Sequence, residues 1–259
     1  MKTIGILGCG WLGKALAKSL IEENYVVKGT TTSSHKISDL KAENITPYLI
    51  NLSDENYSEL DSFLLHLDLL IIAIPPSRIE QVPTYAENFK KLIAYLSPDL
   101  PIFMMSSISV YAPQKSLIFE NNELFSEEIT AQQIRDAEKT LQSYTKQLTI
   151  LRLGGLFGTD RHPIEYISRL PSLNNPDLSI NMVHQLDILQ FTKFLISQKQ
   201  VDSIYNLVSP TYLNRRTYYS QMASELKIKL PPEDKNNWDL EKKVDGSKIM
   251  HQSGLTYLY

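Results

Sequence analysis

The sequence predicts a doubly wound α/β fold, a mainly parallel sheet covered by helices on both faces, followed by a small C-terminal lobe. Apolar strands and amphipathic helices alternate regularly up to about residue 153. The strands are short, nearly continuous apolar runs, such as TIGIL at 3–7 and DLLIIAI at 68–74, which is typical of parallel strands buried on both faces. Loop-rich chain with several prolines follows. We therefore expect one region at 1–153 and a second, which completes the sheet and forms the lobe, at 154–259.

The strands are predicted from apolar runs that end in Gly, Pro, Ser or polar residues. Pro47 near the start of one run is tolerable there, and Pro75 and Pro76 close another. The runs lie at residues 3–7, 25–30, 46–51, 68–74, 101–105, 149–153 and 204–208.

The helices are predicted from apolar residues at helical spacing, of which Leu12, Leu16 and Leu20 are the clearest set. Pro83 is acceptable near a helix start, where its missing N–H costs little. The expected helices cover residues 11–23, 57–67, 83–96, 130–147, 186–197 and 214–226.

The composition excludes several classes of protein. The 259 residues are 42% hydrophobic and 21% charged, with a net charge of −3 and no basic stripe, so a nucleic-acid partner has no electrostatic support. No apolar run approaches the roughly 20 residues that span a bilayer, and the N-terminus does not resemble a signal peptide. Cys9 is the only cysteine, which indicates a reducing cytoplasm. No histidine or cysteine spacing predicts a metal site.

A glycine-rich turn follows the first strand. Gly8, Gly10 and Gly13 form the pattern G-x-G-x-x-G, which here follows a strand and opens a helix, as the motif requires. Gly8 permits the tight turn, Gly10 lets the backbone approach a pyrophosphate, and Gly13 lets helix and strand pack closely. The helix N-terminus then offers amide groups to the phosphates. The pattern predicts a dinucleotide-binding Rossmann unit.

The end of the second strand bears on the choice between NAD and NADP. An NAD enzyme usually carries Asp or Glu there, whereas this chain has hydroxyls at Thr30, Thr31 and Thr32 and a nearby Lys36. That set suits a 2′-phosphate, so NADP is preferred over NAD; the alternative is that the hydroxyls merely cap the next helix. Other residues expected against the cofactor are Trp11, Leu12, Ile74, Pro75 and Ser106.

Six segments spread over nearly the whole chain carry motifs of one known family: SSISVY at 106–111, RLGGLFG at 152–158, VHQLD at 183–187, IYN at 204–206, VDGSK at 244–248 and GL at 254–255. In these segments and their order, the chain resembles the atypical extended short-chain dehydrogenase/reductases, or SDR proteins, of the NAD-dependent epimerase/dehydratase-like type. The extended enzymes usually carry G-x-x-G-x-x-G, from which the turn here departs. The resemblance implies NAD(P)-dependent chemistry on a small carbonyl or hydroxyl substrate, including sugar-like ones.

The resemblance also implies a catalytic serine, which Ser107 matches. The usual Tyr and Lys of a Y-x-x-x-K motif are missing: with Glu138 taken as the helix glutamate of the family, Thr130 and Ile134 occupy their places. If the alignment of this helix is shifted, Arg135 and Lys139 fall at the Tyr and Lys places, and a tyrosine is still absent. The literal Y-x-x-x-K at 111–115 contains a proline and lies in a loop, so we interpret it as a coincidence. The alternative for Ser107 is a strand-end hydroxyl that bonds its own backbone.

Arg135 and His184 are the candidate substitutes for the missing pair. Arg135 could orient a carboxylate or phosphate, and His184 titrates near neutrality. Each has a structural alternative, a surface arginine in the first case and a structural hydrogen bond in the second. Asp187 is more readily explained as a helix-starting residue, and Arg161 and His162 as loop residues that face either a cleft or solvent.

Two hypotheses from different classes follow. The first is an NAD(P)-dependent oxidoreductase or epimerase, a monomer or homodimer that binds a small-molecule substrate with no nucleic acid or membrane partner. The second is a cofactor-binding sensor or scaffold that has lost catalysis. A third, a reductase with a helical second domain, fits poorly with the strand at 204–208.

Overall fold

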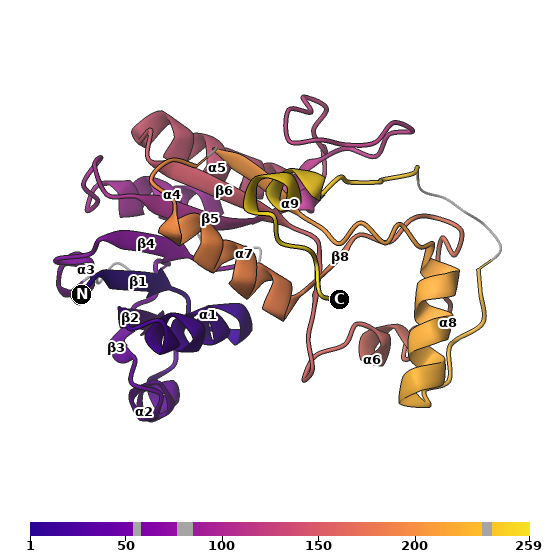
Figure 1. Cartoon of the computed structure of the whole chain (residues 1–259), viewed down its shortest axis with the longest axis horizontal. Helices are drawn as coiled ribbons and strands as arrows, with labels where there is room; N and C mark the ends of the chain where they lie inside the picture. The colour runs from indigo at the N-terminus through magenta and orange to yellow at the C-terminus, as the bar shows by residue number, and fades with distance from the viewer. Residues whose placement is uncertain (54–57, 77–84, 202, 235–239) are drawn as a thin grey trace. The chain divides into compact units, whose positions relative to one another are not determined.

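The structure is a computed structural model that describes residues 1–53, 58–76, 85–201, 203–234 and 240–259 (Figure 1). Strands and helices alternate through its first part. They are β1 (Thr3–Leu7), α1 (Trp11–Glu22), β2 (Val26–Thr31), α2 (Ile37–Ala42), β3 (Thr46–Leu49), α3 (Leu60–Leu64), β4 (Leu69–Ile72), α4 (Tyr85–Ile93), β5 (Ile102–Ser107), α5 (Ile129–Tyr144) and β6 (Leu148–Leu153). The later elements are β7 (Gly155–Phe157), α6 (Ile164–Ile167), β8 (Met182–His184), α7 (Gln185–Ser197), β9 (Ile204–Leu207), α8 (Arg215–Leu226) and α9 (Ser247–Ser253).

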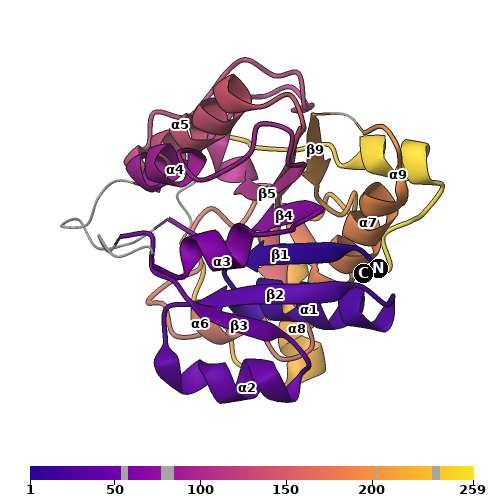
Figure 2. The ribbon, with the colours of Figure 1, turned by 90° about the vertical axis from the view of Figure 1, so that its left-hand side faces the viewer.

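Within the described residues, seven strands form one sheet in the order β3-β2-β1-β4-β5-β6-β9. The pairs β2–β3, β1–β2, β1–β4 and β4–β5 are parallel, and Figure 2 shows β3, β2, β1 and β4 side by side. The chain steps from β1 outward to β3 and then returns to β4 on the other side of β1. The strand order therefore reverses between β1 and β4, the place where such sheets bind ligands at their carboxyl ends. The predicted doubly wound α/β fold is confirmed.

Successive residues of β1 face opposite layers of helices. A Cβ at Gly5 would lie 3.1 Å from the ring of Phe63 on α3, whereas the Ile6 side chain faces the other way, toward Gly13 on α1. Both Ile6 and Phe63 are fully buried. Because side chains alternate along a strand, β1 packs against one helix on each face. The helices α4 and α5 lie side by side (Figure 2).

The chain divides into two compact units. The first comprises Met1–Val110, Glu127–Leu151 and Leu195–Ile204, and the second Tyr111–Ser126, Arg152–Phe194 and Tyr205–Tyr259. The second unit has its own apolar cluster around α6 and α8, and its strands β7 and β8 pair in parallel. Asn214 caps α8 by accepting a hydrogen bond from the Thr217 amide at 2.8 Å. The division of function between residues 1–153 and 154–259 stays a prediction.

Most predicted elements are observed with small changes at their ends. The helix predicted at 57–67 is observed as α3, and the one at 83–96 as α4; residues 57 and 83 themselves lie outside the described residues. The elements α6, α9, β7 and β8 are absent from the sequence-based prediction. They are too short to show a periodic pattern, so only tertiary contacts define them.

The early end of α3 has a specific cause. The ammonium of Lys28, on β2, donates to three backbone carbonyls at the end of this helix: Ser62 at 2.9 Å, Phe63 at 3.3 Å and Leu65 at 2.7 Å. The last carbonyls of a helix have no intrahelical donors, and they carry the negative end of the helix dipole. Desolvation lowers the pKa of Lys28, and these carbonyls compensate its charge. Lys28 therefore ties the helix α3 to the edge of the sheet.

We predict that Lys28→Met lowers the free energy of unfolding by about 1–2 kcal/mol, because three charge-assisted hydrogen bonds are lost while the aliphatic stem is kept. Lys90→Met, at an exposed position on α4, is the control and should change stability by less than about 0.5 kcal/mol. Urea denaturation measures both. Equal stability of the two variants would show that the Lys28 contacts contribute nothing.

Candidate functional site

A pocket of about 460 Å³ lies at the carboxyl ends of β1, β2 and β4, entirely within the first unit. Its walls come from the glycine turn after β1, the threonines that end β2, the chain after β3 and the Ala73–Pro76 segment after β4. This is the edge at which the strand order reverses. The eighteen described residues that line it include no carboxylate and one cation, Lys36.

The three glycines of the turn have distinct roles in the geometry. Gly8 has φ of +102°, which side chains rarely tolerate, and a Cβ there would lie 2.6 Å from Ile74. A Cβ at Gly13 would lie 2.1 Å from the carbonyl oxygen of Gly8, so the helix could not approach the strand. A Cβ at Gly10 would meet no protein atom within 4 Å. Gly8 and Gly13 are thus required by the fold, whereas the bare backbone at Gly10 faces open space.

The turn is fastened to β2. The Gly8 amide donates to Thr30 Oγ1 at 2.8 Å, and the Cys9 amide donates to the Thr30 carbonyl at 2.8 Å. The Cys9 side chain packs against Gly29, where a Cβ would lie 2.5 Å from its sulfur. Burial raises the pKa of Cys9 to about 12, so its thiol stays protonated and unreactive at neutral pH. Cys9 serves as a small packing residue.

The rim of the pocket beyond β2 carries exposed polar groups. Thr32 and Lys36 are exposed and line the pocket, whereas Thr30 and Thr31 are buried. Thr31 Oγ1 accepts from the Ser33 amide at 3.2 Å. Neither Ser33 before the 3-10 turn nor Lys36 before α2 makes a side-chain cap, so the alternative that this tract caps the next helix gains no support there.

Two asparagines line the pocket that the sequence analysis did not single out. Asn51 follows β3, and the sheet topology could have indicated it, because all parallel strands end at the same edge. Asn88 lies on α4, where no sequence signal marked it. It is nine-tenths buried, its amide nitrogen is 3.4 Å from Ser53 Oγ, and its Oδ1 has no hydrogen-bond partner among the residues that the structure describes. An acceptor without a donor at this depth is costly to the fold alone.

Of the twelve residues predicted against a cofactor, eight line the pocket: Gly8, Gly10, Thr30, Thr31, Thr32, Lys36, Ile74 and Pro75. The other four are absent from its lining: Trp11, Leu12, Gly13 and Ser106. Leu12 and Gly13 are buried in the base of α1, and Ser106 is buried at the end of β5. Tyr85, which also lines the pocket, fixes the chain after β4 by donating to the Ile74 carbonyl at 2.8 Å.

The end of β5 holds two serines with different environments. Ser106 donates to Glu138 on α5, with 2.6 Å between the oxygens, and Glu138 is fully buried. Arg135, one turn earlier on α5, lies 3.4 Å from the other carboxylate oxygen of Glu138. Ser107 is half-buried, and its Oγ accepts from the Ser109 amide at 3.1 Å. Ser107 thus makes the local backbone bond of its structural alternative, and its own proton is still available to donate.

The helix α5 offers no substitute phenol or ammonium at the two predicted places. Thr130 is exposed near its start, and Ile134 is buried in its apolar face. Lys139, from the shifted register, is exposed and pairs with Asp136 at 3.7 Å. Arg135 differs from Lys139, because its partner Glu138 also accepts a hydrogen bond from Ser106 at the end of β5.

His184 belongs to the second unit. Its Nδ1 accepts from the Leu186 amide at 3.2 Å, so the neutral ring carries its proton on Nε2. The ring stacks on Tyr259, with 3.8 Å between centroids, and packs edge-on against Phe157. Burial lowers the pKa of His184, so the ring is uncharged at neutral pH. The predicted structural hydrogen bond is therefore present.

Asp187 and His162, also in the second unit, are structurally engaged. Asp187 is fully buried and accepts from the Leu258 amide at 2.7 Å and from Gln190 at 3.1 Å, which attaches the C-terminal segment to α7. Burial raises the pKa of Asp187, and the amides oppose this shift. His162 Nδ1 accepts from the Ile164 amide at 3.2 Å, and Arg161 beside it is exposed.

Two negative findings bound the chemistry. In the parts of the chain that the structure describes, no three His, Cys, Asp or Glu residues gather as metal ligands would. Over the same residues, none of the helices combines the length and the apolar character that crossing a membrane requires.

The sequence was compared with protein families and with known proteins. One family matches the part of the chain that contains the pocket. The profile of a family described as NADP oxidoreductase, coenzyme F420-dependent, matches residues 3–94. Protein YeeZ of Escherichia coli K12 is 28% identical over 267 residues, which cover 100% of this chain and 97% of that protein.

Two solved structures are similar over nearly the full length. The UDP-glucuronic acid 4-epimerase of Bacillus cereus, in complex with UDP-glucuronic acid and NAD, has a TM-score of 0.81 at 14% identity, covering 99% of this chain and 94% of that one. An SDR superfamily protein of Agrobacterium tumefaciens with bound NAD has a TM-score of 0.78 at 12% identity, covering 99% and 93%. The chain has the SDR fold. The resemblance found in the sequence is confirmed at the level of fold.

We predict that Gly13→Ala lowers the free energy of unfolding by about 2 kcal/mol or more, because its Cβ would overlap the Gly8 carbonyl. Gly10→Ala should change it by less than about 0.5 kcal/mol, since the new methyl meets only open space and φ is −77°. Chemical denaturation without ligand measures both. A Gly13→Ala variant as stable as wild type would contradict the described packing of α1 on β1.

Proposed function

We propose that this SDR-fold protein is an NADP-dependent oxidoreductase or epimerase that acts on a small carbonyl or hydroxyl substrate. The single observation that carries the proposal is the pocket of the first unit. It combines the glycine turn at a helix N-terminus with a rim that, among the described lining residues, holds Lys36 and no carboxylate. NAD instead of NADP is the alternative cofactor.

The residues present fit a dinucleotide. Helix α1 begins after Gly10 without a side-chain cap, so its first amides and its dipole can receive the pyrophosphate. The space beside Gly10 is open, as a close approach of phosphate requires. The Oδ1 of Asn88, which has no partner in the described part of the chain, offers an acceptor to a ligand amino group within the same pocket. These three features point to one elongated ligand with an anionic centre.

The preference for NADP rests on charge. A carboxylate at the end of the second strand would bind the ribose 2′-hydroxyl of NAD and repel a 2′-phosphate. Here the corresponding positions are hydroxyls, and Lys36 stands on the rim beside Thr32. A dianionic 2′-phosphate gains from an ammonium at this place, and an unphosphorylated ribose gains little.

The chemistry proposed for the chain itself is limited to positioning and proton donation. When bound, the nicotinamide supplies or accepts a hydride. Ser107, held in place by the Ser109 amide, would donate its hydroxyl proton in a hydrogen bond to a substrate oxygen. Arg135, oriented by buried Glu138, would fix an anionic part of the substrate. We propose that residues 154–259, which include His184, bind the substrate; the structurally similar epimerase of B. cereus was solved with UDP-glucuronic acid and NAD, which supports a small-molecule substrate.

The second candidate is a cofactor-binding sensor or scaffold without turnover. The observation in its favour is that Thr130 is exposed and Ile134 buried where the resemblance implies a Tyr and a Lys. Titration with NADPH separates binding from turnover. A screen of carbonyl compounds and nucleotide sugars, monitored at the nicotinamide absorbance band, then tests catalysis. Tight binding without any turnover favours the sensor.

We predict that Lys36→Glu weakens NADPH binding about 10- to 100-fold, because an attraction of roughly 1–3 kcal/mol becomes a repulsion. Binding of NADH should change less than about threefold. Lys41→Glu, on the last turn of α2, is the matched control and should leave both affinities unchanged. Calorimetric titration measures the four constants. If wild type binds NADH as tightly as NADPH and Lys36→Glu alters neither, the NADP preference is wrong.

We predict that Ser107→Ala lowers the catalytic rate, whereas Ser106→Ala lowers the stability of the fold. Loss of the Ser107 hydroxyl should lower kcat about 10- to 100-fold on any substrate found, with little change in stability. Loss of the Ser106 hydroxyl leaves buried Glu138 short of a donor and should cost about 1–3 kcal/mol of stability. Steady-state kinetics and thermal unfolding of both variants separate the two roles. Undiminished kcat in Ser107→Ala would remove it from the mechanism.

A further inference from the structure

A second pocket, of about 310 Å³, lies in the first unit at the amino ends of the strands, opposite the edge that holds the dinucleotide pocket. It shares no lining residue with the dinucleotide pocket. The strands β1 and β4 run from one pocket to the other, since Ile4 and Leu69 lie at their starts and Gly8 and Ala73 follow their ends. The two sites can therefore be occupied independently. The volume is at the lower end of the range for small-molecule sites.

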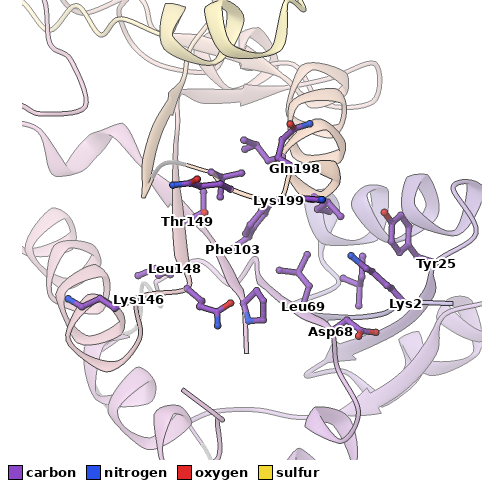
Figure 3. Close-up of a pocket in the computed structure, with 17 residues that line it drawn as sticks. Lys2, Tyr25, Asp68, Leu69, Phe103, Lys146, Leu148, Thr149, Gln198 and Lys199 are labelled. Atoms are coloured by element: carbon purple, nitrogen blue, oxygen red, sulfur yellow. The ribbon is translucent and has the colours of Figure 1, made fainter. Parts of the chain in front are cut away.

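The floor of this pocket is apolar. Ile4, Leu69, Phe103 and Leu148 come from the starts of β1, β4, β5 and β6, and each is at most 7% exposed. Figure 3 shows Leu69 and Phe103 between the polar side chains of the rim. Such a floor favours the apolar body of a ligand, because contact with it removes apolar surface of the ligand from water.

The rim is positively charged. Lys2, Lys146 and Lys199 come from three separate segments, and Figure 3 shows Lys146 across the pocket from Lys2 and Lys199. Among the described residues that line the pocket, Asp68 is the only acidic one, and its Oδ2 already accepts from the Thr3 amide at 2.7 Å. The three lysines and one aspartate of this described lining give it a net positive charge, on a chain whose net charge is −3.

From this combination we infer that the pocket binds a small organic anion with an apolar body, such as an aliphatic carboxylate. The body occupies the floor formed by the strand starts, and the carboxylate lies at the rim that carries the lysines. Neither the lysine rim nor the apolar floor is sufficient for binding by itself, because exposed lysines alone bind anions weakly and the floor alone is small.

The test uses three probes in calorimetric titration of the full chain. Octanoate carries both features, octanol only the apolar body, and acetate only the charge. We expect octanoate to bind at least tenfold more tightly than octanol or acetate. No heat with octanoate, or equal binding of octanoate and octanol, would overturn the inference.

Two variants locate the binding. The triple variant Lys2→Gln, Lys146→Gln, Lys199→Gln should weaken octanoate binding at least tenfold, and Val201→Trp, on the half-buried wall, should block it. The matched control changes three exposed lysines outside the pocket, Lys41→Gln, Lys90→Gln and Lys139→Gln, and should bind octanoate as wild type does. Thermal unfolding confirms that each variant is folded. If both pocket variants bind octanoate normally, the anion binds elsewhere and the inference is wrong.

Gly10→Ala separates this site from the dinucleotide pocket. It changes only the latter, so it should leave the octanoate affinity unchanged. Loss of octanoate binding in Gly10→Ala would place the anion in the dinucleotide pocket instead. Because no NADP is needed for these titrations, the result stands whether or not the proposed function holds.

Discussion

The tight corner between β1 and α1 is the constraint on which the rest of the first unit depends. The helix can begin directly over the end of the strand only because Gly8 adopts a positive φ and Gly13 has no side chain. The Gly8 amide then donates to Thr30, which fixes the end of β2 beside the corner. The consequence is a pocket into which a helix N-terminus, rather than side chains, projects. Among the described residues that line this pocket, Lys36 on the rim is the one cation.

A buried group of polar side chains lies at the end of β5. Glu138 is fully removed from solvent, and Ser106 and Arg135 bind its two carboxylate oxygens. A buried carboxylate is tolerated only when it is paired in this way, and the pairing orients Arg135 in turn. Thr130 and Ile134 occupy the places where the resemblance implies a Tyr and a Lys, and the charged groups near them on α5 include Arg135 and Glu138. Any chemistry at this edge has to use that pair or Ser107.

Several segments that resemble the SDR family are structural in this protein. Tyr111 donates to Asn206 and accepts from Arg152, each at 2.8 Å, and all three are almost fully buried in the second unit. Asp245 accepts from the amide and the hydroxyl of Ser247 and so orders the start of α9. Because such buried polar groups need their partners, the fold itself accounts for these residues, and their presence alone does not indicate catalysis.

The sequence by itself determined the alternation of strands and helices and the conformation of the glycine turn, because local periodicity and the absence of side chains act within a few residues of the chain. It also identified Thr32 and Lys36, since they directly follow the strand that ends at the pocket. Only the tertiary structure decided the roles of Asn88 and of the partners of Glu138. These contacts join residues on different elements, and hydrogen bonds of that kind leave no periodic signal in the chain. The short elements α6, α9, β7 and β8 were decided in the same way, by packing against distant segments rather than by their own sequence.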